Sequence, residues 1–288
     1  MKRNFRDLLA ARWAAGKFVC VGLDSEEEKI PKCVKAVNTS DGERDRVIEF
    51  NATIVEATSD LVCAYKINLA FYVALGHEGL IALLRTMMHI RTSTPEVPVI
   101  LDAKRADIGN TNLGYARQAF DYLEADAITV HPYLGAEALE PFLKQEDKGI
   151  FILCRTSNPG ADEFQSLPIM TDWSLDGQLP LYQYVAMKVA KDWNKRGNCG
   201  LVVGATCPNE LAVVRQIADD LPILIPGIGA QGGDLKAAIK AGKNSCGQGM
   251  VINSSRGIIF ASAGPDYAAA ARQATLDLHQ QIAACLNG

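Results

Sequence analysis

Short runs of apolar, often β-branched residues recur along the whole chain, and each run is followed by a stretch with helical periodicity. In these stretches the apolar residues return every three or four positions, as Val47, Phe50, Ile54 and Ala57 do. Because the apolar runs are continuous rather than alternating with polar residues, they are typical of parallel strands covered on both faces. The eight strands that this pattern predicts are Phe18–Leu23, Leu61–Ile67, Val97–Leu101, Ala127–Val130, Gly149–Cys154, Gly200–Gly204, Pro222–Ile225 and about Gly249–Asn253.

Eight strand–helix units in one chain predict a (β/α)8 barrel, the TIM-barrel architecture of the α/β class. We expect residues 1–288 to form this barrel as a single domain, with an N-terminal helix and an alanine-rich helix over about Ala263–Leu286. An open doubly wound sheet would have a glycine-rich turn after the first strand, but the chain has Asp24-Ser25-Glu26 there. Between Arg155 and about Pro180, clustered turn residues predict a long irregular loop.

Composition and charge exclude several classes of partner. The net charge of −4 and the scattered lysines and arginines argue against nucleic acid. No apolar run is as long as a membrane span, and the N-terminal residues lack the apolar core of a signal peptide. The eight cysteines form no C-x-x-C pair, and the four histidines are too widely spaced for a zinc pattern. We therefore expect a cytoplasmic protein from a reducing compartment, without a bound metal.

Charged and polar residues stand at the ends of the predicted strands, where (β/α)8 barrels place their reacting groups. Asp102 and Lys104 are two positions apart on one strand, so both side chains point to the same face. Lys66, in the preceding strand, is surrounded by apolar residues and needs a nearby carboxylate. We expect Asp102 to lie between the two lysines in a functional site; a salt bridge that only stabilises the barrel is the alternative. The strand ends carry, in chain order, Asp24, Lys66, Asp102, Lys104, His131, Ser157 and Arg256.

Glycines follow the seventh and eighth predicted strands, in the segments Pro226–Asp234 and Asn253–Gly257. Barrels often bind phosphate at this place, through backbone N–H groups at helix N-termini. The Arg256 guanidinium adds a bidentate hydrogen-bond donor. We therefore expect a phosphate site here rather than plain turns.

The segment Asp102–Thr111 reads D-A-K-R-A-D-I-G-N-T and resembles the D-x-K-x-x-D-I-x-x-T signature of the orotidine 5'-phosphate decarboxylase family. Further matches, in the family's order, are Lys66-Ile67-Asn68, Thr156–Gly160, Pro226–Gly233 and Ser255-Arg256-Gly257. The resemblance covers nearly the whole chain and is to the longer bacterial-type members. It implies a carboxy-lyase without a cofactor, which converts orotidine 5'-monophosphate into UMP and carbon dioxide in de novo pyrimidine biosynthesis.

The same resemblance implies roles for individual residues and a homodimer with shared active sites. Lys104 would protonate C6 of the pyrimidine after carbon dioxide leaves, with Asp102 beside the departing carboxylate and Lys66 in the same charge network. Asp107 would complete the network from the second subunit, although a lone aspartate at this place is more readily expected to cap the next helix. The implied substrate-binding residues are Asp24 and Thr111 at the ribose, Ile108 near the base, Ser157 at the pyrimidine amide, Gln231 and Arg256 at the phosphate, and also Asn68 and Pro226.

Two other functions remain as alternatives. Magnesium-dependent hexulose-6-phosphate synthases and keto-gulonate-6-phosphate decarboxylases share the barrel and the D-x-K-x-x-D pattern. The Asp107–Thr111 segment, Ser157 in its T-S-N-P context and the loop around Gln231 favour the nucleotide enzyme. A catalytically silent nucleotide-binding barrel is disfavoured, because all four positions of the charge network are intact and binding alone would not need Lys104 next to Asp102.

Overall fold

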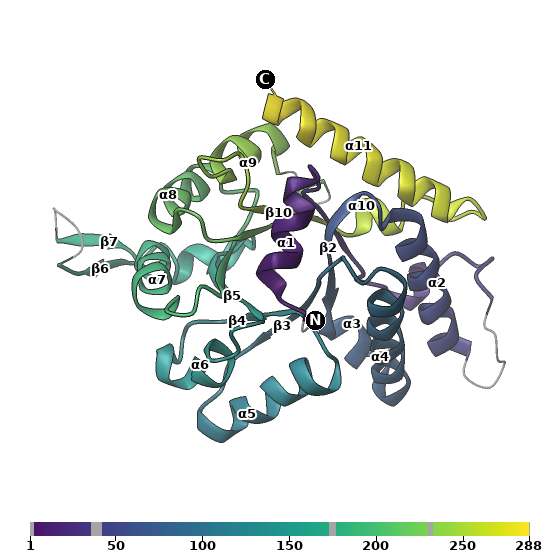
Figure 1. Ribbon diagram of the computed structural model, residues 1–288, viewed down its shortest axis with the longest axis horizontal. Coiled ribbons are helices and arrows are strands. Elements are labelled where there is room, and N and C mark those ends of the chain that lie inside the picture. Colours follow the sequence, from purple (N-terminus) through teal and green to yellow (C-terminus); the bar gives the residue numbers. More distant parts are fainter. Residues whose placement is uncertain (1–2, 36–41, 173–176, 230–232, 288) are drawn as a thin grey trace.

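Eight parallel strands close into a barrel in the computed structural model, which describes residues 3–35, 42–172, 177–229 and 233–287 (Figure 1). Around the barrel the strands lie in the order β1-β10-β9-β8-β5-β4-β3-β2. Each predicted strand is present, and the predicted (β/α)8 fold is confirmed. The strands are β1 Val19–Gly22, β2 Val62–Asn68, β3 Val99–Arg105, β4 Ala127–Val130, β5 Gly149–Arg155, β8 Cys199–Val203, β9 Ile223–Pro226 and β10 Met250–Ser254.

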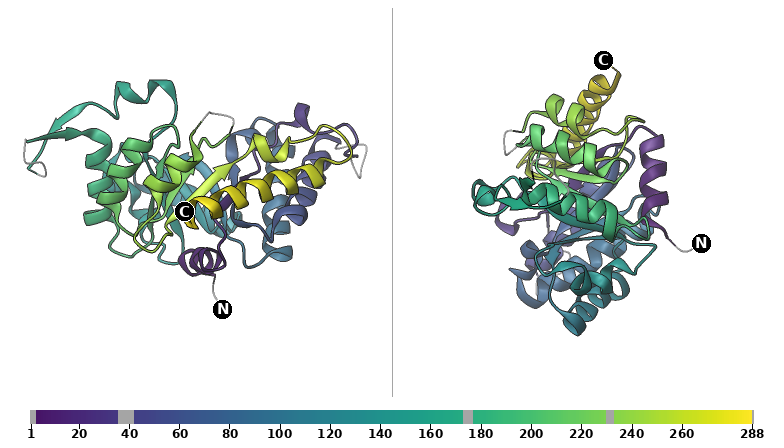
Figure 2. Two further views of the ribbon diagram at one scale, coloured as in Figure 1. Left: turned by 90° about the horizontal axis from the view of Figure 1, so that it is seen from above. Right: turned by 90° about the vertical axis from the view of Figure 1, so that its left-hand side faces the viewer.

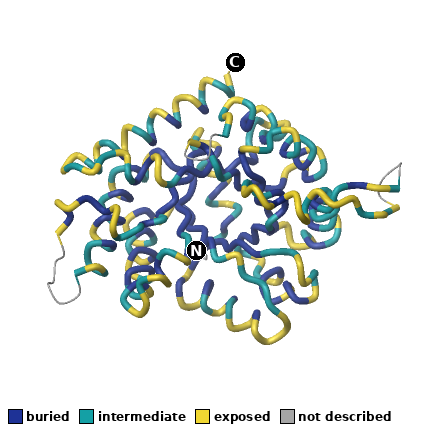
Figure 3. The backbone as a smooth tube through the Cα atoms, turned by 180° about the vertical axis from the view of Figure 1, so that it is seen from behind, coloured by how far each residue is buried: buried dark blue, intermediate teal, exposed yellow. Residues whose placement is uncertain are grey.

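Helices surround the barrel, and their exposed residues face outward while the strands in the middle are buried (Figure 3). Among the described residues, no helix is both long and apolar enough to cross a membrane. The α-helices are α1 Phe5–Ala14, α2 Gly42–Thr58, α3 Leu69–Val73, α4 Gly76–Ser93, α5 Gly109–Arg117, α6 Gly135–Leu143, α7 Leu181–Lys188, α8 Pro208–Ala218, α9 Leu235–Gly242, α10 Arg256–Ile259 and α11 Tyr267–Asn287. Wider π turns extend α5 over Gln118–Tyr122 and α7 over Val189–Trp193, and a short 3-10 helix covers Glu27–Lys29.

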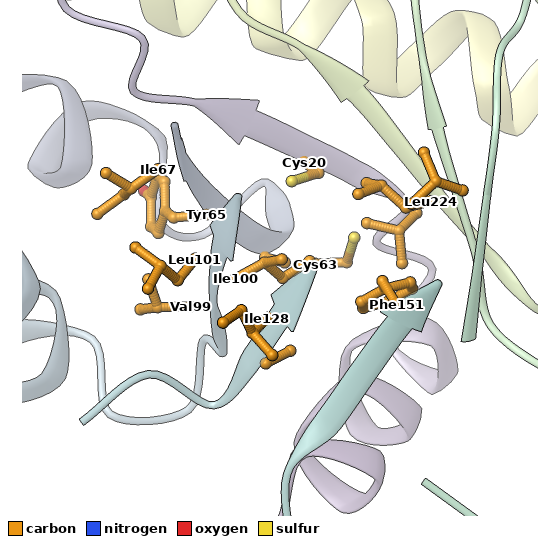
Figure 4. Packing of buried hydrophobic residues seen from close by; sticks show 14 of the residues in the cluster. Cys20, Cys63, Tyr65, Ile67, Val99, Ile100, Leu101, Ile128, Phe151 and Leu224 are labelled. Atoms are coloured by element: carbon orange, nitrogen blue, oxygen red, sulfur yellow. The ribbon is translucent and has the colours of Figure 1, made fainter. Parts of the chain in front are cut away.

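The strands are buried on both faces, which explains why their sequences are continuously apolar. Tyr65 and Ile67 of β2 pair in register with Val99 and Leu101 of β3, and Figure 4 shows the four side chains gathered together. All four are at most 1% exposed. Such burial on the helix-facing side leaves the alternate positions of each strand, including Lys66, for the barrel interior.

Helix α1 closes the N-terminal end of the barrel and crosses it in Figure 1. The Phe5 ring packs edge-on against Phe151 of β5, with 5.6 Å between the ring centroids. The indole N–H of Trp13 donates a hydrogen bond of 2.8 Å to the carbonyl of Met250, the first residue of β10. Helix α1 therefore covers the end of the barrel at which the strands begin.

The chain leaves the barrel after β5, where the sequence suggested irregular structure. The structure instead has a 3-10 helix over Pro159–Glu163 and a small antiparallel hairpin of β6 Pro168–Met170 and β7 Gln178–Pro180. The hairpin projects away from the barrel in Figure 1 and in the left view of Figure 2. Strands of three residues are too short to show an alternating pattern, so periodicity could not predict them.

Candidate active site

A cavity of about 540 Å³ opens at the C-terminal ends of the strands, a size within the usual range of small-molecule sites. Eight of the twelve site residues predicted from the sequence line it, and they come from both halves of the barrel. These residues are Asp24, Lys66, Asn68, Asp102, Lys104, Ser157, Pro226 and Arg256.

Four charged side chains from neighbouring strands form one row in this cavity. The ammonium nitrogen of Lys66 lies 3.1 Å from Asp24 Oδ1 and 3.4 Å from Asp102 Oδ2. That of Lys104 lies 2.7 Å from Asp102 Oδ1. The signs alternate along the row, and Asp102 lies between the two lysines, the arrangement that the strand pattern suggested. The ion pair of Asp24 with Lys66 was not expected from the sequence.

Within this row, Lys66 and Asp102 are both held in their charged forms. Burial by itself would lower the pKa of Lys66, but the negative charges of Asp24 and Asp102 outweigh it and hold that pKa above its usual value. Burial would likewise raise the pKa of Asp102, but the ammonium groups of Lys66 and Lys104 and a hydrogen bond from Thr129 lower it to about 2. Asp102 is therefore a carboxylate at neutral pH although it is buried.

The two lysines differ in how far they are open to the cavity. The side chain of Lys66 is 5% exposed, whereas that of Lys104 is 50% exposed. Lys66 is enclosed by its two carboxylate partners, so it can orient Asp102 but has little contact with a ligand. Lys104 presents its ammonium group to the space that a ligand would fill.

Part of the cavity lining is apolar. Leu153 of β5, Val202 of β8 and Leu224 of β9 line it, together with Ile228 in the loop after β9. A bound ligand therefore meets apolar side chains as well as the charged row. Exclusion of water by such a surface strengthens the electrostatic interactions of the charged row.

The cavity extends to the ends of β9 and β10, where the sequence suggested a phosphate site. Pro226, Gly227 and Ser255 line it there with Arg256, the first residue of α10. Within the described parts of the chain, no hydrogen bond or ion pair of the Arg256 guanidinium is found, so this cation is open to an anionic ligand. Gln231, the other predicted phosphate ligand, lies outside the described residues.

Three predicted site residues, Asp107, Ile108 and Thr111, do not line the cavity of their own chain. Asp107 does not cap α5: the N-cap residue is Ile108, and Asp107 Oδ1 accepts a hydrogen bond from the Ile108 N–H at 2.7 Å. Asn112 holds this segment in place, because its side chain accepts from the Asp107 N–H and donates to the Asp107 carbonyl. Ile108 is 63% exposed and Thr111 is exposed, so the segment lies on the surface of the chain.

The end of β5 places Ser157 in the cavity beside the end of β8. A Cβ atom on Gly204 would lie 2.7 Å from Ser157 Cβ, so only glycine allows this close approach. The preceding residue, Thr156, is held by Gln165: its N–H donates to Gln165 Oε1, and Gln165 Nε2 donates to its hydroxyl, both at 2.8 Å. Gln165 thereby fixes the backbone next to Ser157.

Several cavity residues were missed by reasoning from the sequence. Thr129 of β4 and Asn253 of β10 are polar residues on the inner face of buried strands, and both line the cavity. The pattern of polar residues at strand ends pointed to His131, which follows β4, and not to residues within that strand. A polar residue at an inward-facing position of an otherwise apolar strand was the available signal.

Comparisons with known proteins bear on this site as a whole. A family model described as "Orotidine 5'-phosphate decarboxylase / HUMPS family" matches residues 17–274. A protein named orotidine 5'-phosphate decarboxylase from Cellvibrio japonicus is 46% identical over 280 residues, which are 97% of this chain and 98% of that protein. A protein of the same name from Azoarcus sp. is 47% identical with the same coverage. The solved structure of Leishmania donovani OMP decarboxylase superimposes with a TM-score of 0.82 at 38% identity and covers 99% of both chains.

Proposed function

The chain belongs to the orotidine 5'-phosphate decarboxylase / HUMPS family, and we infer from this membership that it decarboxylates orotidine 5'-monophosphate. It is a carboxy-lyase of pyrimidine biosynthesis, and its product is UMP. The family model also covers the magnesium-dependent enzymes that share the barrel, but the relatives at 46% and 47% identity carry the name of the nucleotide enzyme. The observation that carries the assignment within the structure is the row Asp24–Lys66–Asp102–Lys104, which faces a cavity that ends at Arg256.

For the reaction step, we propose that Lys104 is the proton donor. The bond between C6 and the carboxylate breaks, carbon dioxide leaves, and the electron pair stays on C6, where the Lys104 ammonium delivers a proton. Lys104 then regains a proton from water. Lys104 is half exposed to the cavity and is already held by Asp102, so its positive charge is oriented before the reaction begins.

Asp102 would lie beside the substrate carboxylate and repel it, and the repulsion ends when carbon dioxide leaves. Lys66 counterbalances the Asp102 charge from the other side, at 3.4 Å. In this role Lys66 keeps Asp102 ionised and in place. The chemistry then requires no electron sink from a cofactor, because electrostatics and a proton donor act directly at C6.

The rest of the substrate would bind along the cavity. We propose that Arg256 and Gln231 bind the phosphate, that Ser157 contacts the pyrimidine amide, and that Asp24 holds a ribose hydroxyl. Pro226 would also contact the substrate. Asn68, which we also expect to contact the substrate, lines the cavity. Its side chain caps α3 by accepting a hydrogen bond of 3.1 Å from the Ala70 N–H. Binding energy from the distant phosphate helps to hold the base against Lys104.

We further propose a homodimer in which each cavity receives Asp107, Ile108 and Thr111 from the other subunit. Two observations support this arrangement: the three residues do not line the cavity of their own chain, and the exposed apolar side chains of Ile108 and Leu113 lie on the same segment. A second chain that covers this segment would remove the apolar surface from water. The proposed dimer works in the cytoplasm and has no nucleic-acid partner, in keeping with its free cysteines and net charge of −4.

The test is the loss of ultraviolet absorbance of orotidine 5'-monophosphate when purified protein is added in excess EDTA. We expect full turnover in EDTA. A strict requirement for magnesium would instead assign the chain to the magnesium-dependent branch of the family. The Lys104→Ala protein, purified in the same way, controls for contaminating host enzyme.

A further inference from the structure

The backbone around Lys104 departs from a regular strand. Between β3 and β4, Leu101 pairs with Ile128 and Arg105 pairs with Val130, so three residues of β3 lie opposite a single residue of β4. The φ angle of Lys104 is 46°, in the left-handed region that side-chain-bearing residues rarely adopt. At such a bulge the extra residues lose their partners in the strand ladder, and a strained conformation persists only where its surroundings hold it.

The single residue opposite this bulge is Thr129, which is 1% exposed. The Lys104 N–H donates a hydrogen bond of 3.0 Å to the Thr129 hydroxyl oxygen. The same hydroxyl donates a hydrogen bond of 2.7 Å to Asp102 Oδ1. One side chain therefore replaces the missing backbone partner of Lys104 and orients the carboxylate that binds the Lys104 ammonium.

We propose that Thr129 is a positioning residue of the decarboxylation, whose hydroxyl fixes the bulged backbone of Lys104 relative to the Asp102 carboxylate and so aims the Lys104 ammonium into the cavity. The inference rests on the proposed function and adds to it a residue that does not itself react. The hydroxyl, Asp102 Oδ1, and the backbone and ammonium groups of Lys104 form a closed ring of hydrogen bonds. Because the ring includes both ends of Lys104, the ammonium cannot shift without breaking one of these bonds.

The Thr129 hydroxyl satisfies both neighbours because it accepts from one and donates to the other. Valine has the same shape, but it would leave the Lys104 N–H without an acceptor and Asp102 Oδ1 with one donor fewer. Serine would keep both hydrogen bonds and lose one methyl group. The strand around Thr129 is otherwise apolar, from Ala127 to Val130, so packing alone would be served as well by valine.

The experiment compares Thr129→Val and Thr129→Ser with the unaltered protein, with kcat for orotidine 5'-monophosphate and the Kd for UMP as readouts. Thr275→Val is the matched control, because the Thr275 hydroxyl is also buried and, among the described residues, its one hydrogen bond is to the Ala271 carbonyl of α11. We expect Thr129→Val to lower kcat by about 10- to 100-fold, since a displaced catalytic group loses rate steeply. The Kd for UMP should stay within about threefold, and Thr129→Ser should stay within about fivefold of the original kcat.

A Thr129→Val protein with near-normal kcat would overturn the proposal. So would a Thr129→Ser protein whose kcat falls as far as that of the valine variant. The proposal would also be overturned if the UMP affinity fell as far as kcat, because the Thr129 hydroxyl would then act on ligand binding. If the valine variant does not fold, Thr129→Ala takes its place beside Thr129→Ser. Failure of the proposed function is distinguishable, because the unaltered protein would then not decarboxylate the nucleotide at all.

Discussion

The Lys104 ammonium lies 2.7 Å from Oδ1 of Asp102, yet the Asp102 side chain is 11% exposed and that of Lys104 is 50% exposed. The carboxylate is thus held by the protein, while the ammonium forms part of the cavity surface. A ligand that displaces water from the cavity completes the desolvation of this pair and strengthens its field.

Replacement of the proposed proton donor should separate catalysis from binding. Lys104→Ala is expected to lower kcat by at least about 1,000-fold, because both a general acid and an electrostatic stabiliser are lost. UMP should still bind, since Arg256 and the rest of the cavity are unchanged. Turnover and UMP titration measure the two effects, with Lys240→Ala on the exposed side of α9 as the control. Near-normal turnover would remove Lys104 from the proton-donor role.

The phosphate contact of Arg256 can be isolated by comparing two ligands. Arg256→Ala should raise the Kd of UMP by about 10- to 100-fold, the effect of losing a hydrogen-bonded charge. The Kd of uridine, which has no phosphate, should change little. Isothermal titration with both ligands measures the difference. Equal losses for UMP and uridine would show that Arg256 does not bind the phosphate.

If the active site is shared between subunits, mixing two inactive variants should restore activity. Asp107→Ala and Lys104→Ala subunits, mixed and allowed to exchange, form hybrid dimers in which one site carries both changes and the other carries none. With random exchange, about a quarter of the original activity should return. Mixing either variant with itself is the control. If subunit exchange is demonstrated and no activity returns, Asp107 does not act across the interface.

Asp102 should make stability depend on pH in the acid range. Burial opposes its ionisation, but Lys66 and Lys104 lower its pKa from 3.8 to about 2. A group with a lowered folded-state pKa stabilises the protein fully above its ordinary pKa, and this contribution is lost as the pH falls through the folded value. From about pH 4 to pH 2, the free energy of unfolding should therefore fall by roughly 2 kcal/mol on account of this group.

The Asp102→Asn protein lacks that contribution, so its stability should vary less between pH 4 and pH 2 than that of the unaltered protein. Urea unfolding at a series of pH values measures the difference. Lys66 does not interfere, because its raised pKa affects stability only in the alkaline range. Asp277→Asn, on the exposed face of α11, should keep the full pH dependence. Identical curves for Asp102→Asn and the unaltered protein would contradict the ionised, paired state of Asp102.

Local patterns were sufficient to predict the barrel and the centre of the charge row. Continuous apolar runs identify buried parallel strands because both faces of each strand are covered. The two-residue spacing of Asp102 and Lys104 places both on one face because side chains alternate along a strand. Lys66 follows from its apolar surroundings, since a buried ammonium requires a carboxylate partner.

Only the tertiary structure decided which groups meet across strands. The hydrogen bonds of Thr129 depend on a bulge in the register between β3 and β4, and the ion pair of Asp24 with Lys66 depends on how β1 lies beside β2. Register and barrel closure result from the packing of all eight strands, so no single segment encodes them. The sequence by itself therefore determined the fold and the residue types of the site. The folded barrel determined that Thr129 holds Lys104, and it left Asp107 outside the cavity of its own chain.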